Sequence, residues 1–144
     1  MKVVVQKSKK SSVSIEGKII NEIESGMVLL VSFTQTDTME NILKMTKKIA
    51  NLRIFDDENG VMNKSILDVG GEILSISQFT LYGDVTKGNR PSYIKALNGE
   101  QAVKLYNAFN EEINKYVITK TGEFGENMVV NITNDGPTTI ILEF

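Results

Sequence analysis

The sequence of 144 residues contains neither cysteine nor histidine. Without cysteine the chain forms no disulfide and offers no thiolate nucleophile. Without histidine it builds no Ser-His-Asp arrangement, and zinc sites made of histidine and cysteine are excluded as well. An enzyme with this composition must rely on carboxylates, a lysine, backbone amides or groups of its own substrate. We expect no metal and no cofactor.

Long apolar runs and linkers are also missing. The longest purely apolar run, residues 27–31, is far shorter than a membrane span. The opening segment MKVVVQKSKK has too short an apolar stretch for a signal peptide, so we expect a cytoplasmic protein. Only two prolines occur, and no repeat or low-complexity stretch interrupts the chain. These features predict a single domain over residues 1–144.

The net charge of −2 means that the whole molecule is not a polycation. A nucleic-acid partner would have to meet a local basic patch, for which the candidates are Lys7, Lys9, Lys10, Lys44, Lys47, Lys48, Arg53, Lys87 and Arg90. Charge alone favours the simpler interpretation that these are solvated surface side chains.

Apolar alternation predicts strands at residues 3–6, 12–15, 18–23, 27–33, 72–80, 128–133 and 138–144. The second and third form a hairpin, and the fourth is apolar enough to be buried on both faces. The segment DDENG (residues 56–60) indicates a turn, since the ligand spacing of a calcium loop is missing. The last two strands are expected to pair through the turn that Asp-Gly predicts.

Two helices are predicted between these strands. Thr38 can cap the first, whose apolar positions Ile42, Met45, Ile49 and Leu52 follow helical spacing. Asn98 and Gln101 resemble a capping box for the second, whose apolar stripe is Ala102, Leu105, Tyr106, Phe109, Ile113 and Tyr116. The order of elements predicts an α+β fold, with two principal helices packed on a mainly antiparallel sheet or partial β-barrel.

Two motifs stand out from this framework. SQFTLYGD (residues 77–84) places the polar Ser77, Gln78 and Thr80 among apolar residues at the end of a strand. Buried polar groups need partners, so the segment is either a functional site or simply a strand that runs into a turn. NDGPTT (residues 134–139) sets proline directly after Asp-Gly, which permits a cis peptide between Gly136 and Pro137.

Together these motifs resemble the D-aminoacyl-tRNA deacylase family, whose two signatures read approximately SQFTL and NxGPxT. Further segments that look like the family occur in family order over essentially the whole chain, namely VQKSKKSSVSIEGK, RIFDDENGVMN, GNRPSY and TGEFGENM. The resemblance implies a homodimer that hydrolyses the ester of D-aminoacyl-tRNA, with active sites at the interface. It also implies that Gly136 and Pro137, joined by a cis peptide, project into the partner's pocket and reject L-aminoacyl groups.

The resemblance implies that the ester is cleaved beside Ser77, Gln78, Phe79 and Thr80. Thr80 has two possible roles, as a hydroxyl nucleophile or as a backbone amide that forms an oxyanion hole with the amide of Phe79. We favour the amides, because no histidine is present to activate a hydroxyl and the 2′-hydroxyl of tRNA can assist. Phe124 and Met128 correspond to the family's pocket for the terminal adenine, and the alternative is that both are ordinary core. Asn134 and Thr138 are also expected at the substrate.

Two positions depart from the family pattern. Lys7 stands where arginine is usual, and lysine lacks the bidentate fork that would support the Gly-Pro segment. Thr138 replaces the usual valine after the proline and adds a hydroxyl. The alternative functions are a non-catalytic tRNA- or RNA-binding dimer of the same fold, and an editing module related to those of some threonyl-tRNA synthetases.

Overall fold

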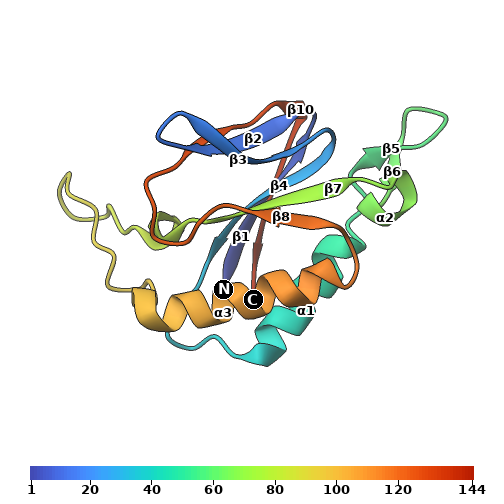
Figure 1. Ribbon diagram of the computed structural model, residues 1–144. Helices are drawn as coiled ribbons and strands as arrows, with labels where there is room; N and C mark the ends of the chain where they lie inside the picture. The colour runs from blue at the N-terminus through green and yellow to red at the C-terminus, as the bar shows by residue number, and fades with distance from the viewer.

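The computed structural model describes residues 1–144 as two sheets, a small hairpin and helices that lie along one face (Figure 1). The larger helices are α1 (Met39–Ala50) and α3 (Gly99–Asn114), and α2 (Ile66–Val69) is a single turn. The strands are β1 (Lys2–Ser8), β2 (Ser11–Ile15), β3 (Lys18–Ile23), β4 (Gly26–Ser32), β5 (Phe55–Asp56), β6 (Met62–Lys64), β7 (Glu72–Ser77), β8 (Thr119–Thr121), β9 (Val129–Asn131) and β10 (Asn134–Glu143).

The five-stranded sheet has the order β10-β1-β4-β7-β8. Its β10-β1-β4 half is antiparallel, whereas β4 pairs with β7 and β7 with β8 in parallel. Parallel pairing needs a long crossover. The segment containing α1 joins β4 to β7, and the segment containing α3 joins β7 to β8. The predicted α+β class with two principal helices is confirmed, but the parallel half of the sheet was not predicted.

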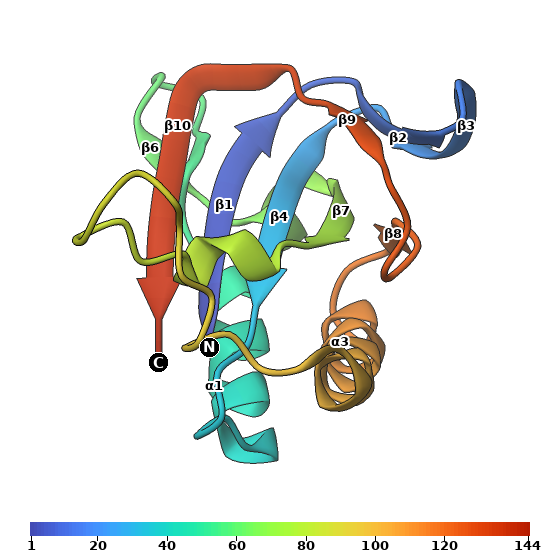
Figure 2. The same ribbon diagram turned by 90° about the vertical axis from the view of Figure 1, so that its left-hand side faces the viewer.

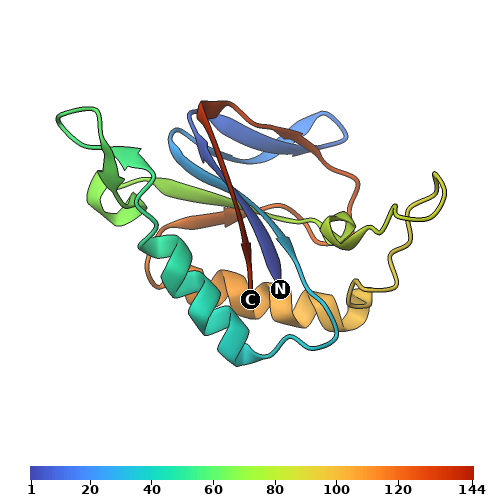
Figure 3. The ribbon, with the colours of Figure 1, turned by 180° about the vertical axis from the view of Figure 1, so that it is seen from behind.

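Both large helices pack on the same face of this sheet, as the views from the front and from behind show (Figures 1 and 3). Ile42, Met45 and Ile49 of α1 are fully buried, as are Phe109 and Ile113 of α3. Most of each predicted apolar stripe is therefore core, but Leu52 lies after the end of α1, and Tyr116 lies after the end of α3 and is exposed. The Asn98 side chain accepts a hydrogen bond of 3.1 Å from the amide of Gln101, which confirms the predicted start of α3.

The opposite face is only partly covered. The sheet β3-β2-β9 lies over β4 and β7 and encloses a small apolar cluster of Val13, Ile23, Val28, Leu74 and Ile76. β10 lies at the edge of the large sheet, with Ile140 and Leu142 against the core and Ile141 66% exposed on the other side. None of the helices has the length and apolar character that a membrane span requires.

Three sequence predictions are wrong. The strand predicted to reach residue 80 ends at Ser77, where the chain turns into the 3-10 helix η1 (Phe79–Tyr82). The last two strands form no hairpin, because β9 pairs with β2 and β10 pairs with β1. The segment predicted as their turn, residues 134–137, instead belongs to β10. DDENG does form a turn, between the short strands β5 and β6, which were not predicted.

Candidate active site

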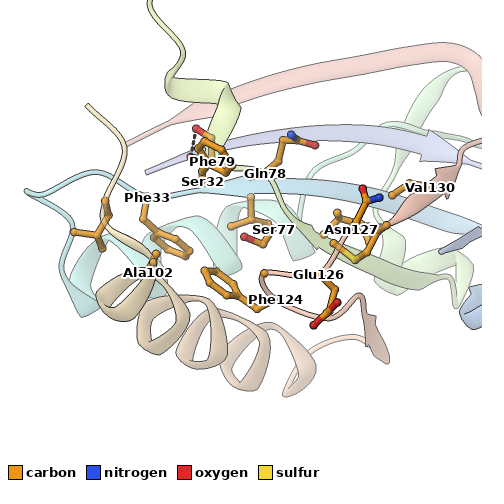
Figure 4. Close-up of a pocket in the computed structure, with 16 residues that line it drawn as sticks. Ser32, Phe33, Ser77, Gln78, Phe79, Ala102, Phe124, Glu126, Asn127 and Val130 are labelled. Carbon is orange, nitrogen blue, oxygen red and sulfur yellow. Dashed lines mark hydrogen bonds between the residues drawn. The ribbon is translucent and has the colours of Figure 1, made fainter. Parts of the chain in front are cut away.

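A cavity of about 530 Å³ opens where the parallel strands β4 and β7 end (Figure 4). Ligands of open α/β sheets bind at this end of parallel strands, where the chain leaves the sheet and its amides lose their ladder partners. The lining comes from the ends of β4 and β7, the start of α3, the loop before β9, and β9 itself. Its residues are Val31, Ser32, Phe33, Ile76, Ser77, Gln78, Phe79, Leu97, Gly99, Ala102, Phe124, Gly125, Glu126, Asn127, Met128 and Val130.

Ser77, Gln78 and Phe79 of the motif SQFT form one rim of this cavity. The amide of Gln78 still donates to the carbonyl of Val31 at 2.8 Å, and η1 begins at the next residue. In a 3-10 helix the first amides have no acceptor within the helix. The amides of Phe79 and Thr80 hold this position, whereas the amide of Leu81 already donates to the carbonyl of Gln78 at 3.2 Å. Two adjacent backbone donors are thus available beside the cavity.

The side chain of Thr80 is exposed and does not line the cavity. Its hydroxyl accepts a hydrogen bond from the side-chain amide nitrogen Nε2 of Gln78. No carboxylate or lysine amine is hydrogen-bonded to this hydroxyl. A threonine nucleophile requires such a base to remove its proton.

Aromatic rings form the opposite wall. Phe124 and Phe33 project into the same space between η1 and α3 (Figure 4). Phe124 is half-buried and packs on Tyr106, with ring centroids 5.8 Å apart, and the Tyr106 hydroxyl donates to the carbonyl of Ser75 at 2.7 Å. Met128 is half-buried as well. Both predicted adenine-pocket residues thus line the cavity while also touching the core clusters.

The cavity is poor in charge. Glu126 is its only charged lining residue and is exposed to solvent. Nearby on η1, burial is the main cause that raises the pKa of Tyr82 to about 12, so its phenol stays protonated at neutral pH. No three carboxylates are grouped so that they could hold a metal ion. The chemistry available here is therefore that of backbone donors, apolar walls and the substrate itself.

The Gly-Pro segment lies outside this cavity. Gly136 and Pro137, joined by a cis peptide, are exposed, and neither they nor Asn134 and Thr138 are among the lining residues. They lie at the start of β10, the edge strand that runs down the large sheet in Figure 2. The structure therefore brings together Ser77, Gln78, Phe79, Phe124 and Met128 but places the second motif elsewhere.

Hydrogen bonds fix the Gly-Pro segment on β1. The Asn134 amide fits its surroundings when its nitrogen donates to the carbonyls of Lys7 and Thr138, both at 3.0 Å. Its oxygen then accepts from the Thr139 hydroxyl and the Gln6 amide, also at 3.0 Å. All four partners lie on β1 or on β10 itself, so Asn134 shapes the segment instead of facing the cavity of its own chain.

Lys7 contributes to the same anchor. Its side chain is only 11% exposed, and its amine lies 3.3 Å from Asp56 and 3.6 Å from Asp135, the residue before Gly136. The ring of Phe55 lies 5.9 Å from this amine. Lysine at this position therefore does hold the segment, as a point charge between two carboxylates and without a bidentate fork.

Sequence reasoning missed several lining residues, including Ser32, Phe33, Leu97 and Asn127. Ser32 ends β4 and Phe33 follows it directly, so the rule that sites lie at the ends of parallel strands would have found them. That signal was lost because the sheet was predicted to be mainly antiparallel. Asn127 lies within the quoted segment TGEFGENM, but only its neighbours Phe124 and Met128 were selected.

Comparison with known proteins places the chain in one family. Residues 4–143 match the family described as D-Tyr-tRNA(Tyr) deacylase. The chain is 54% identical to a D-aminoacyl-tRNA deacylase of Clostridium novyi (strain NT), over 99% of this chain and 97% of that protein. It is 53% identical to a D-aminoacyl-tRNA deacylase of Bacillus cytotoxicus, over 99% of each chain.

Solved structures share the fold. One, named c-Myc DNA Unwinding Element Binding Protein, superposes with a TM-score of 0.95 at 43% identity and covers 100% of this chain and 99% of its own. Another, described as a probable eukaryotic D-amino acid tRNA deacylase, has a TM-score of 0.84 at 16% identity. It covers 98% of this chain and 97% of its own, and it shows the fold alone. Because the family match spans nearly all of the chain and its first motif forms the cavity rim, this chain belongs to the D-Tyr-tRNA(Tyr) deacylase family of ester hydrolases.

Proposed function

We propose that this protein hydrolyses the ester bond of D-aminoacyl-tRNA and releases the free D-amino acid. The observation that carries the proposal is the cavity, which joins two backbone donors of the SQFT motif with the apolar wall of Phe124 and Met128. An adenosine base fits such a wall, because stacking on an aromatic side chain stabilises a base by roughly 1–3 kcal/mol. The ester attached to that adenosine would then lie beside the amides.

In the proposed reaction, the amides of Phe79 and Thr80 donate to the carbonyl oxygen as it becomes an oxyanion. Preorganised donors of this kind contribute roughly 3–4 kcal/mol each to transition-state stabilisation. The attacking water has no histidine to activate it, so the ribose 2′-hydroxyl of the substrate orients it and shares its proton. An aminoacyl ester is an activated ester, which makes this limited set of groups sufficient.

Replacing Thr80 with alanine is expected to leave kcat/KM within about fivefold of the wild type, since the hydroxyl only accepts one hydrogen bond, worth about 1 kcal/mol. Thr80→Val, which keeps the volume, is the matched variant and should behave alike. Single-turnover hydrolysis of D-tyrosyl-tRNA measures the effect. A loss of about 1000-fold or more in both variants, with folding and tRNA binding intact, would make the hydroxyl the nucleophile.

Chirality selection is proposed to come from a second copy of the chain. Gly136 and Pro137 are exposed and outside the cavity of their own chain, so they are free to enter that of a partner. The half-covered face beside β10, with Ile141 exposed on an edge strand, favours a homodimer. The main-chain atoms of the partner's Gly136 and Pro137 would meet an L-side chain and leave a D-side chain free.

Selection by exclusion of an L-side chain has a consequence for glycine. Glycine has no side chain to reject, so glycyl-tRNA would also be cleaved. Asn134 and Thr138 would hold the Gly-Pro segment against the substrate, and the reaction would take place in the cytoplasm, where aminoacyl-tRNA is found. Release of D-tyrosine from D-tyrosyl-tRNA tests the activity. Binding of the tRNA without release would favour a non-catalytic tRNA-binding dimer instead.

A further inference from the structure

A closed loop projects from the edge of the molecule where η1 and the start of α3 lie (Figure 1). Residues 85–91 are enclosed by a bridge between Asp84 and Ser92, whose two backbone hydrogen bonds measure 2.8 and 2.9 Å. The Asp84 carboxylate also accepts from the amide and hydroxyl of Thr86, at 3.0 and 2.7 Å. Its other oxygen lies 3.2 Å from the amine of Lys95.

The carboxylate of Asp84 at the base of this loop stays charged over a wide pH range. The hydrogen bonds from Thr86, and then the amine of Lys95, lower the pKa of Asp84 to about 2. Asp84 therefore stays ionised and neutralises Lys95 at physiological pH. The loop itself, residues 85–91, contains Lys87 and Arg90 and no acidic residue. It is a cationic arm on a molecule whose net charge is −2.

Lys87 and Arg90 differ from most other cations of this chain. Both are exposed, and neither lies within 4.0 Å of a carboxylate. Lys10, Lys44, Lys64 and Lys115, by contrast, are each paired with a glutamate. Two unpaired positive charges three residues apart on one projecting loop attract anions, and a polyanion engages both at once.

The arm is connected directly to the cavity rim. The ring of Tyr93, just after the arm, packs edge-on against Phe79 with centroids 5.1 Å apart. Gln35 donates to the carbonyl of Ile94 at 2.9 Å, and Leu97, a lining residue, donates to the carbonyl of Phe33 at 2.9 Å. The return of the loop is thus fixed to the elements that form the cavity, and its start follows η1 directly along the chain.

We propose that this arm binds backbone phosphates of the tRNA acceptor end, through Lys87 and Arg90, while the terminal adenosine occupies the cavity. The inference rests on the proposed function. The terminal nucleotide is covalently joined to a chain of phosphates, and these must run outward past the cavity rim. Arg90 can hold a phosphate with two parallel hydrogen bonds, and Lys87 adds a compact charge. Each contact would release counterions, which makes binding depend on salt.

The test compares the double variant K87A/R90A with K47A/K48A, which removes two exposed and unpaired lysines from α1. Affinity for uncharged tRNA is measured from 0.05 to 0.4 M salt. We expect K87A/R90A to lower the slope of log Kobs against log salt by about 1.4 to 1.8, since each phosphate contact contributes about 0.7 to 0.9. K47A/K48A should keep the wild-type slope. R90K, which keeps the charge, should retain the contribution of this position to the slope.

A second readout separates the arm from the chemistry. With D-tyrosyl-tRNA, K87A/R90A should raise KM about tenfold at 0.15 M salt and leave kcat unchanged. With the D-tyrosyl ester of adenosine, which has no phosphate, both constants should stay at wild-type values. An unchanged salt slope would overturn the proposal, and so would a change in the oligomeric mass of K87A/R90A, because the arm would then belong to a subunit contact. If the wild type cleaves neither ester, the proposed function fails, while the salt slope still tests the arm.

Discussion

Replacing Gly136 with alanine is expected to lower kcat/KM for D-tyrosyl-tRNA on the order of 100-fold while the protein remains folded. Gly136 has φ +117°, and a Cβ there would lie 2.6 Å from the hydroxyl of Thr138 and 3.0 Å from its amide. Alanine is strained at this φ, and its Cβ would crowd Thr138, so we expect the segment to shift. A displacement of about 1 Å at a group that positions the substrate costs roughly 100-fold in rate.

The matched control is Gly60→Ala in the β5–β6 turn. Gly60 also has a positive φ, +72°, but an added Cβ would meet no atom within 4 Å. This variant should lose only about 1–2 kcal/mol of stability through backbone strain and keep the wild-type kcat/KM. Equal activity of the Gly136 and Gly60 variants would show that the Gly-Pro segment does not act in catalysis.

Mixing two inactive variants tests whether the segment acts across subunits. Gly99→Trp is the partner variant, because Gly99 lines the cavity and has open space around it, which the indole would fill. Reassembled with Gly136→Ala, it gives mixed dimers in which one intact cavity faces one intact segment. Random association of equal amounts makes half of the dimers mixed, and each mixed dimer has one functional site of its two. About a quarter of the wild-type activity should therefore return. No recovery would contradict the cross-subunit arrangement.

Replacing Gly26 with alanine is expected to have the largest effect on stability. Gly26 begins β4 at φ +142°, and a Cβ there would lie 1.9 Å from the backbone oxygen of Glu72 on the parallel strand β7. Because the contact is with backbone, no side chain can rotate away to relieve it. Strain and overpacking together cost at least about 3 kcal/mol.

Thermal unfolding followed by circular dichroism measures this loss. The midpoint Tm should fall by about 10 °C or more, or the variant should fail to accumulate as folded protein. Gly60→Ala is again the control and should lose only a few degrees. A Tm for Gly26→Ala equal to that of Gly60→Ala would show that β4 and β7 are not packed as closely as the structure has them.

Local patterns in the sequence predicted the strongly periodic elements. The stripes of α1 and α3, the β2–β3 hairpin and the buried strand β4 each carry their own signal in spacing and capping. Pairing between distant strands carries no such signal. Asp-Gly after β9 predicts a hairpin locally, yet β9 and β10 find better partners in β2 and β1. Tertiary pairing overrode the turn preference of two residues.

The candidate site was likewise only partly predictable from the sequence. Polar residues at the end of an apolar strand gave only a weak indication of a site at SQFT, and family resemblance was needed to select it; the structure places Ser77, Gln78 and Phe79 at the cavity. The proposed chemistry depends on the 3-10 turn that leaves the amides of Phe79 and Thr80 without an acceptor in the helix, and side-chain patterns do not encode which amides lose their acceptors. Gly136 and Pro137 could be named from sequence only through family resemblance, because their proposed target lies in another chain.

The central claim is that a rigid piece of main chain reads handedness beside two backbone donors. The most direct measurement is the rate of amino-acid release from D-tyrosyl-tRNA and from L-tyrosyl-tRNA at equal enzyme concentration. The account predicts rapid release of D-tyrosine and release of L-tyrosine no faster than in buffer alone. Equal release from the two substrates would contradict it.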